Sequence, residues 1–183
     1  VSLPIAALIA AVACTEQSPV SPIAAAPLAA SSVSIPVASP WAKIVKGETG
    51  PGSLYALYIP NDWNGEAIYF AHGIRAPGDD ITLGEDQDNF IEVRDALGAL
   101  HYALAYSSFS ENGLAVKDGA QRTHQLRGLL ATELSGLPKR NYLMGYSLGA
   151  LASLSLVEQF PNQYDGLLAM CGEVAGSLRE LQY

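Results

Sequence analysis

A serine enclosed by two glycines is the clearest chemical signal in the sequence. Residues 145–149 read Gly-Tyr-Ser-Leu-Gly, the pattern G-x-S-x-G with Ser147 at its centre. This pattern predicts a sharp turn from a strand into a helix, because a Cβ at Gly145 or Gly149 would collide with the adjacent strand or helix. The turn exposes the hydroxyl at the amino end of a helix, where unpaired N–H groups and the helix dipole favour negative charge. Such a serine is suited to nucleophilic attack on a carbonyl.

The residues around the pattern support this interpretation. An apolar run, residues 142–144, precedes it, and an apolar stretch follows it, so a strand, a turn and a helix are expected in that order. A second feature agrees: the apolar run 68–71 leads directly into His72-Gly73-Ile74.

Short apolar runs alternate with amphipathic stretches after Trp41, which favours strands separated by helices around a mostly parallel sheet. We expect strands over residues 53–59, 66–71, 102–107, 141–146 and 166–171. The first expected helix places Phe90, Val93, Leu97 and Leu100 on one face. The second is expected to begin at Asp118, with Gln121 completing a capping box, to bury Leu126, Leu129, Leu130 and Leu134, and to stop at Gly136 and Pro138. The third is expected over residues 148–160.

The order of these elements and motifs over residues 53–171 resembles the α/β-hydrolases, and the resemblance implies their fold, with helices on both faces of a mostly parallel sheet. It implies that Ser147 is the nucleophile, that Gly145 and Gly149 form the elbow, and that the oxyanion hole consists of the N–H groups of Ile74, or Gly73, and Leu148. Residues 106–113 and 118–149 further resemble secreted bacterial hydrolases of poorly defined substrate.

The histidines do not complete a catalytic triad in the order that the resemblance implies, which is serine, acid, histidine. All three, His72, His101 and His124, precede Ser147. We interpret His72 as structural, His101 as a surface or packing residue, and His124 as a solvated helix residue that is the first alternative base. The expected histidine then lies beyond these residues, and the chain is expected to be an N-terminal part of the fold, truncated after the strand that follows the nucleophile helix and inactive by itself.

Glu173 is the candidate acid of the triad, because it follows the expected strand 166–171. A minority of α/β-hydrolases place their acid after this strand, and the alternative is an exposed loop carboxylate. Cys171, in the same apolar run, is expected to be a buried thiol outside any disulfide framework.

The N-terminal part divides into two segments ahead of a partial hydrolase domain at residues 41–183. Residues 1–14 predict a signal peptide with a lipobox-like end: an uncharged apolar run closes on Ala11-Val12-Ala13, and Cys14 follows as the residue to be lipidated. A plain secretory signal with a chance cysteine is the alternative. Residues 15–40 are rich in Ala, Ser and Pro, which predicts an extended linker.

Composition narrows the classes of partner. A net charge of −8, with no cluster of Lys and Arg, argues against nucleic acid. The acidic residues at 79–88 lack the spacing of a calcium loop, so neither a metal nor a cofactor is expected.

The predicted function is therefore cleavage of a small carboxylic ester by an exported protein, either secreted or held at the periplasm or cell surface through an N-terminal lipid, its only membrane contact. Two alternatives stay open: a serine peptidase of the same fold, and a non-catalytic, lipid-anchored binding module.

Overall fold

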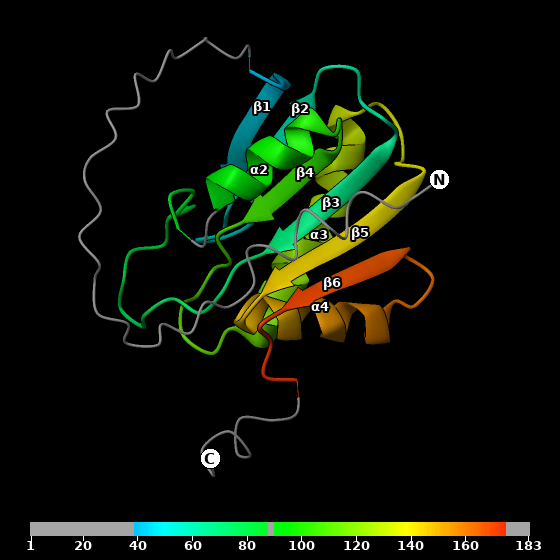
Figure 1. Ribbon diagram of the computed structural model, residues 1–183. Coiled ribbons are helices and arrows are strands. Elements are labelled where there is room, and N and C mark those ends of the chain that lie inside the picture. Colours follow the sequence, from blue (N-terminus) through cyan, green and yellow to red (C-terminus); the bar gives the residue numbers. More distant parts are fainter. Residues whose placement is uncertain (1–38, 88–89, 175–183) are drawn as a thin grey trace, which may run out of the picture. The chain divides into compact units, whose positions relative to one another are not determined.

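Six strands and three helices make up the folded part of the chain. The computed structural model describes residues 39–87 and 90–174 (Figure 1). The elements are β1 (Trp41–Glu48), β2 (Leu54–Pro60), β3 (Glu66–Ala71), α2 (Phe90–Ala99), β4 (Ala103–Ser107), α3 (Val116–Glu133), β5 (Arg140–Tyr146), α4 (Leu148–Gln159) and β6 (Gly166–Met170). The predicted signal peptide with Cys14, and the predicted linker up to residue 38, lie outside the described residues.

The six strands form one mixed sheet in the order β1-β2-β4-β3-β5-β6. The strands β4, β3, β5 and β6 run parallel, whereas β2 pairs antiparallel with both β1 and β4. A parallel neighbour requires a crossover, and α2, α3 and α4 supply the three that link β3, β4, β5 and β6. The carboxyl ends of the four parallel strands therefore meet at one edge of the sheet, where the loops after them converge.

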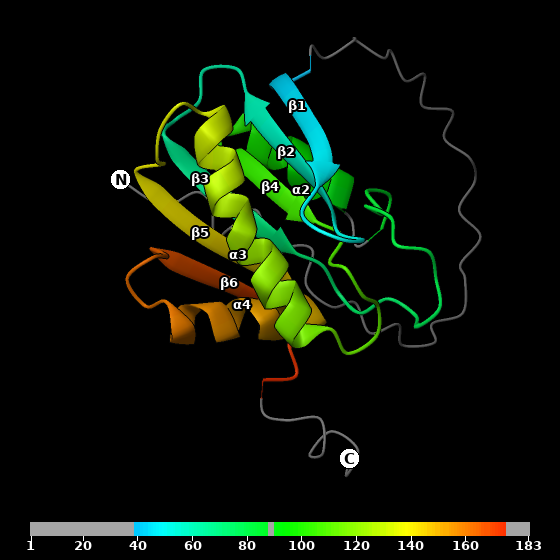
Figure 2. The ribbon, with the colours of Figure 1, turned by 180° about the vertical axis from the view of Figure 1, so that it is seen from behind.

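Helices cover both faces of this sheet, as the sequence predicted. Figure 1 shows α2 on one face, and the reverse view in Figure 2 shows α3 and α4 side by side on the other. The side chains of β3 and β4 are buried nearly throughout, as expected for central strands of a parallel sheet. The largest contribution of α3 to the core comes from Leu126 and Leu130, which pack with Leu143 and Leu156.

The five predicted strands are present, but β1 was not predicted. Most of its residues are exposed or half-exposed and only Trp41 is buried, so the strand carries little of the apolar alternation that marks a strand in sequence. Leu100 was predicted to share one face of α2 with Phe90 and Leu97, but it lies beyond the end of that helix and is 39% exposed.

The predicted capping box at Asp118 is wrong. The helix α3 begins at Val116, and its N-cap residue, Ala115, makes no side-chain cap. Asp118 lies in the first turn, where its carboxylate accepts hydrogen bonds from the backbone N–H and the hydroxyl of Ser110, both at 2.6 Å. Its carboxylate therefore anchors the loop before the helix instead of capping the helix.

Cys171 also differs from its prediction. The residue is exposed and has a φ of 50°, where a buried thiol was expected. The strand β6 ends one residue earlier, at Met170, so Cys171 belongs to the following turn. None of the helices within residues 39–87 and 90–174 combines the length and the apolar character that crossing a membrane requires.

Candidate active site

Ser147 lies on a strained turn between β5 and α4. Its φ of 52° and ψ of −120° fall outside the regions that residues with a side chain ordinarily occupy, which confirms the predicted sharp turn. The N–H of Ser147 donates to the carbonyl of Met170 at 2.8 Å, which fixes the turn to the end of β6. The hydroxyl therefore lies at the carboxyl edge of the sheet, at the amino end of a 12-residue helix.

The two flanking glycines are required by close backbone contacts. A methyl group on Gly149 would lie 2.0 Å from the carbonyl oxygen of Ala71 and 2.5 Å from that of His72. A methyl group on Gly145 would lie 2.2 Å from the carbonyl oxygen of Gly149. Real Cβ atoms do not approach this closely, so the first turn of α4 can pack against β5 and the end of β3 only without these side chains.

The His-Gly turn after β3 lies beside the serine. A methyl group on Gly73 would lie 3.4 Å from Cβ of Ser147 and 3.2 Å from the ring of Tyr146. Ile74 follows, with its side chain 54% exposed, whereas Leu148 is buried on the other side of the serine. The structure thus brings Gly73, Ser147 and Leu148 together, with Ile74 next along the turn. Their roles in catalysis remain predictions.

His72 is part of the core beneath this turn. Its side chain is 2% exposed, its ring stacks on Phe109 at 3.8 Å between centroids, and its Nδ1 donates to the carbonyl of Gly73 at 2.6 Å. Burial, assisted by the charge of Arg75, lowers the pKa of His72 to about 4. The imidazole is therefore neutral at pH 7 and too weakly basic to serve as a general base there.

The other two histidines lie far from the serine. His101 is exposed at the amino end of β4, where Nδ1 contacts the carbonyl of Asn61 at 2.9 Å. His124 stacks on Phe160 at 4.1 Å and pairs with the hydroxyl of Tyr164 at 2.7 Å. Phe160 follows the last residue of α4, about 20 Å along the helix from Ser147 at roughly 1.5 Å per residue. His124 is therefore excluded as the base, and its ring is packed instead of solvated.

Glu173 is exposed in the turn after β6, close to the serine in the chain fold. A methyl group on its neighbour Gly172 would lie 3.7 Å from the carbonyl oxygen of Ser147 and 2.6 Å from Cβ of Ala150. The carboxylate thus belongs to the same edge of the sheet as Ser147, which is the place that the prediction requires, and its role stays a prediction.

A buried arginine beside the His-Gly turn was missed in the sequence. The guanidinium of Arg75 donates to the carbonyls of Thr82 and Leu83, at 2.7 and 3.0 Å, and to the hydroxyl of Tyr106 at 2.7 Å. Within residues 39–87 and 90–174 it has no carboxylate partner. No pattern marks such a residue in sequence, because its partners are mainly backbone carbonyls of a loop.

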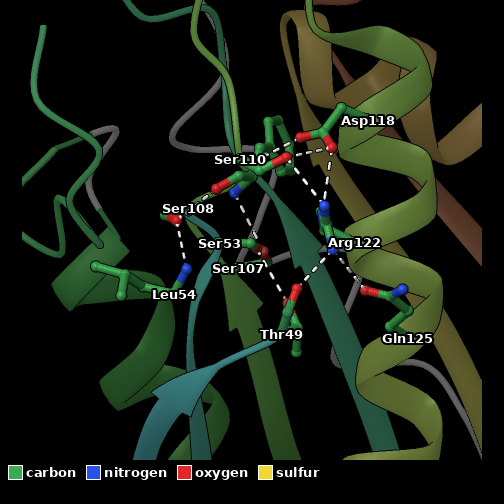
Figure 3. A network of polar contacts seen from close by, with 10 residues as sticks. Thr49, Ser53, Leu54, Ser107, Ser108, Ser110, Asp118, Arg122 and Gln125 are labelled. Carbon is green, nitrogen blue, oxygen red and sulfur yellow. Dashed lines mark hydrogen bonds and ion pairs between the residues drawn. The ribbon is translucent and has the colours of Figure 1, made fainter. Parts of the chain in front are cut away.

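The loop after β4 is fixed by its own polar side chains. Figure 3 shows the network that holds it: Ser107 contacts Ser53 at 3.2 Å between hydroxyls, and the hydroxyl of Ser108 accepts from the N–H of Leu54 at 2.9 Å. On the other side, Arg122 donates to Asp118 at 3.2 Å and to the carbonyl of Thr49 at 2.5 Å. The hydroxyls of Ser107 and Ser108 are therefore already engaged in hydrogen bonds that hold the loop.

Solved structures share this arrangement of strands and helices. The chain superposes on an esterase of Pyrococcus furiosus with a TM-score of 0.54 and 14% identity, over 71% of this chain and 50% of the other. This is the α/β-hydrolase fold. A carboxyl esterase of Bacillus coagulans gives 0.51 at 11% identity, over 68% of this chain and 42% of that one. A probable hydrolytic enzyme of Pseudomonas aeruginosa gives 0.52 at 16%, over 76% and 44%.

At these identities the likeness establishes the α/β-hydrolase fold alone. The chain spans half or less of the length of each of these structures. No protein-family model matches the sequence, and no curated protein sequence matches it either.

The close contacts of the elbow predict the effect of adding one methyl group. Gly149→Ala should lower the free energy of unfolding by about 3 kcal/mol or more, because the methyl group meets backbone that cannot move independently. Gly128→Ala is the matched control, since nothing lies within 4 Å of its Cβ position in α3 and alanine favours a helix by up to about 1 kcal/mol. Urea unfolding measures both. Equal effects of the two substitutions would contradict the geometry.

The low pKa of His72 predicts a loss of stability in acid. Because the pKa of about 4 in the folded state lies below the ordinary 6.5, the unfolded chain takes up the proton first as the pH falls. The contribution is complete above pH 6.5 and declines toward pH 4, by about 3 kcal/mol in total. Between pH 7 and 4 the free energy of unfolding of the wild type should fall by about 3 kcal/mol more than that of His72→Asn. The other titrating groups are the same in both proteins, so their contributions cancel in this comparison. Parallel pH profiles of the two proteins would refute this.

Proposed function

We propose that the protein is a serine hydrolase that cleaves a carboxylic ester, with Ser147 as nucleophile. The observation that carries the proposal is the strained Ser147 at the amino end of α4, held beside the His-Gly turn. Strain of this kind clusters at active sites and persists only where the surrounding structure imposes it. The esterases among the structural neighbours support an ester over a peptide as the substrate.

The proposed reaction has two steps that share one site. The hydroxyl oxygen of Ser147 attacks the ester carbonyl while an imidazole takes its proton, and the carbonyl oxygen becomes an oxyanion. The N–H groups of Leu148 and of Ile74 or Gly73 then stabilise that oxygen. The imidazole returns the proton to the departing alcohol, and water, activated in the same way, releases the acid from Ser147.

The imidazole of this scheme is not one of the three histidines in the chain. His101 and His124 are remote from the serine, and His72 is buried with a pKa of about 4. We therefore assign the base to sequence outside these 183 residues, with Glu173 as the candidate acid that orients it.

Active-site labelling tests the nucleophile directly. In the natural full-length protein, a fluorophosphonate should label Ser147 and Ser147→Ala should abolish both labelling and hydrolysis of an activated ester. Ser155→Ala, a serine of the same helix that pairs with Gln159, is the matched control and should be unaffected. The 183-residue chain alone should turn over slower by a factor on the order of 10⁶, the loss seen when a triad lacks its base. A folded full-length protein that never reacts at Ser147 would favour a binding module.

We also propose that the protein is exported and anchored through lipid on Cys14. The support is the apolar run that ends in Ala11-Val12-Ala13 ahead of this cysteine. The chain has two cysteines, and a thioether on Cys14 and a disulfide between Cys14 and Cys171 exclude each other, because each uses the sulfur of Cys14.

Mass analysis of the mature N-terminal peptide distinguishes these two fates of Cys14. A diacylglyceryl group on Cys14, with the protein in the membrane fraction, is the expected result, and Cys14→Ser should release the protein into the soluble fraction. A peptide in which Cys14 is linked to Cys171, or a mature chain that begins after Cys14, would contradict the proposal.

A further inference from the structure

Phe109 adopts a backbone conformation that a bulky residue seldom takes. Its φ is 60°, in the left-handed region, and its side chain is completely buried. This conformation costs a phenylalanine on the order of 1 kcal/mol or more. Such a conformation persists only where the surrounding structure imposes it. Phe109 lies in the loop after β4, at the same edge of the sheet as Ser147.

Hydrogen bonds on both sides hold this residue in place. Before it, the N–H of Phe109 donates to the hydroxyl of Ser107 at 3.1 Å, and its carbonyl accepts from the hydroxyl of Ser108 at 2.7 Å. After it, Ser110 donates through its N–H and its hydroxyl to Asp118, both at 2.6 Å.

Arg122 keeps that carboxylate in position. It donates to Asp118 at 3.2 Å and reaches Ser110 at 3.2 Å, and both charged side chains are largely buried (Figure 3). A buried ion pair with this many hydrogen bonds restrains the loop more firmly than an exposed pair would.

The ring of Phe109 lies between the two segments that would form the oxyanion hole. It stacks on His72, the first residue of the His-Gly turn, with 3.8 Å between centroids and 22° between planes. It belongs to a small buried cluster with Ala71, Ala115 and Leu148, the residue after the serine. Its far edge rests on α3, where a methyl group on Gly119 would lie 2.8 Å from the ring.

We propose that Phe109 is the positioning residue of the oxyanion hole: its ring, wedged between the His72 turn, Leu148 and α3, sets the separation of the two N–H donors. The inference rests on the proposed function and extends it to a residue that does not touch substrate. The positive φ of Phe109 accompanies this packing of its ring on the end of β3.

The chain contains a matched control for this contact. Phe160 stacks on His124 at 4.1 Å and 10°, at the opposite end of α4 from Ser147, with an ordinary negative φ of −131°. Both phenylalanines therefore stack on an imidazole, but only Phe109 has a positive φ and only Phe109 packs with Leu148, the residue after the serine. Phe109→Leu and Phe160→Leu each remove a ring that stacks on an imidazole, from a fully buried position at Phe109 and from a half-buried one at Phe160.

The experiment measures kcat and KM for an activated ester, and the rate of fluorophosphonate labelling, in the natural full-length protein. Phe109→Leu should lower kcat and the labelling rate by about 10- to 100-fold with KM unchanged, because a misplaced donor weakens binding of the oxyanion and not of the substrate. Phe109→Tyr keeps the ring and should recover at least part of this loss. Phe160→Leu should leave both rates as in the wild type.

A second variant covers the case in which Phe109→Leu does not fold. Asp118→Asn keeps the ring and weakens the restraint on Ser110, so it should lower kcat in the same way by a smaller factor. A wild type that is not labelled at Ser147 would overturn the proposed function and this inference with it. A labelled wild type in which the folded Phe109 or Asp118 variants match Phe160→Leu in rate, or change only KM, would overturn the positioning role alone.

Discussion

The arrangement depends on one close approach, between the first turn of α4 and the carboxyl end of β3. Gly149 lies where a methyl group would be 2.0 Å from the carbonyl oxygen of Ala71, and Gly145 faces Gly149 in the same way. Because Ala71 and His72 begin the His-Gly turn, this contact ties that turn to the serine through backbone atoms. The position of Ser147 relative to the turn is thus set by packing of main chain on main chain, which is far stiffer than contact between side chains.

Backbone strain occurs at several turns of the described chain, and three of the six non-glycine residues with positive φ lie where the loops after the parallel strands converge: Phe109, Ser147 and Cys171. Ser147 and Phe109 both have positive φ, and both follow strands of the parallel part of the sheet. Each is restrained by hydrogen bonds from other elements: Ser147 by Met170 of β6, and Ser110, next to Phe109, by Asp118 of α3. The stability lost locally at these residues is offset by the core between the sheet and α3 and α4, which lies away from the site.

The sequence was sufficient to predict the central strands, the three helices and the elbow, because each has a local signature. Buried strands such as β3 are continuous apolar runs. Gly145 and Gly149 indicate a turn that has no room for side chains. The failures were of two kinds. β1 is an edge strand with little apolar burial, and Asp118 has a local pattern that suits a cap, although its partner, Ser110, is a tertiary contact.

The site residues that the sequence could not reveal were missed for one common reason, which is that their partners are tertiary contacts. Arg75 binds loop carbonyls, and Phe109 is recognisable only by its backbone angle and by its stack on His72. Asp118 and Arg122 are four residues apart, a spacing that a helix brings together, yet on an exposed surface such a pair would restrain little. Its importance comes from burial against a loop, which depends on the tertiary fold.

Arg75 gives the site an electrical character that no catalytic group supplies. Burial lowers the pKa of His72, and the charge of Arg75 lowers it further. The positive potential of the guanidinium therefore acts on the first residue of the turn. An ester is neutral when it binds, and this potential contributes little to its affinity. The oxygen gains its charge only as the serine attacks, and a permanent positive potential then favours the charged state over the neutral one. The guanidinium of Arg75 thus places a fixed positive charge beside the His-Gly turn, in addition to the N–H donors of the proposed oxyanion hole.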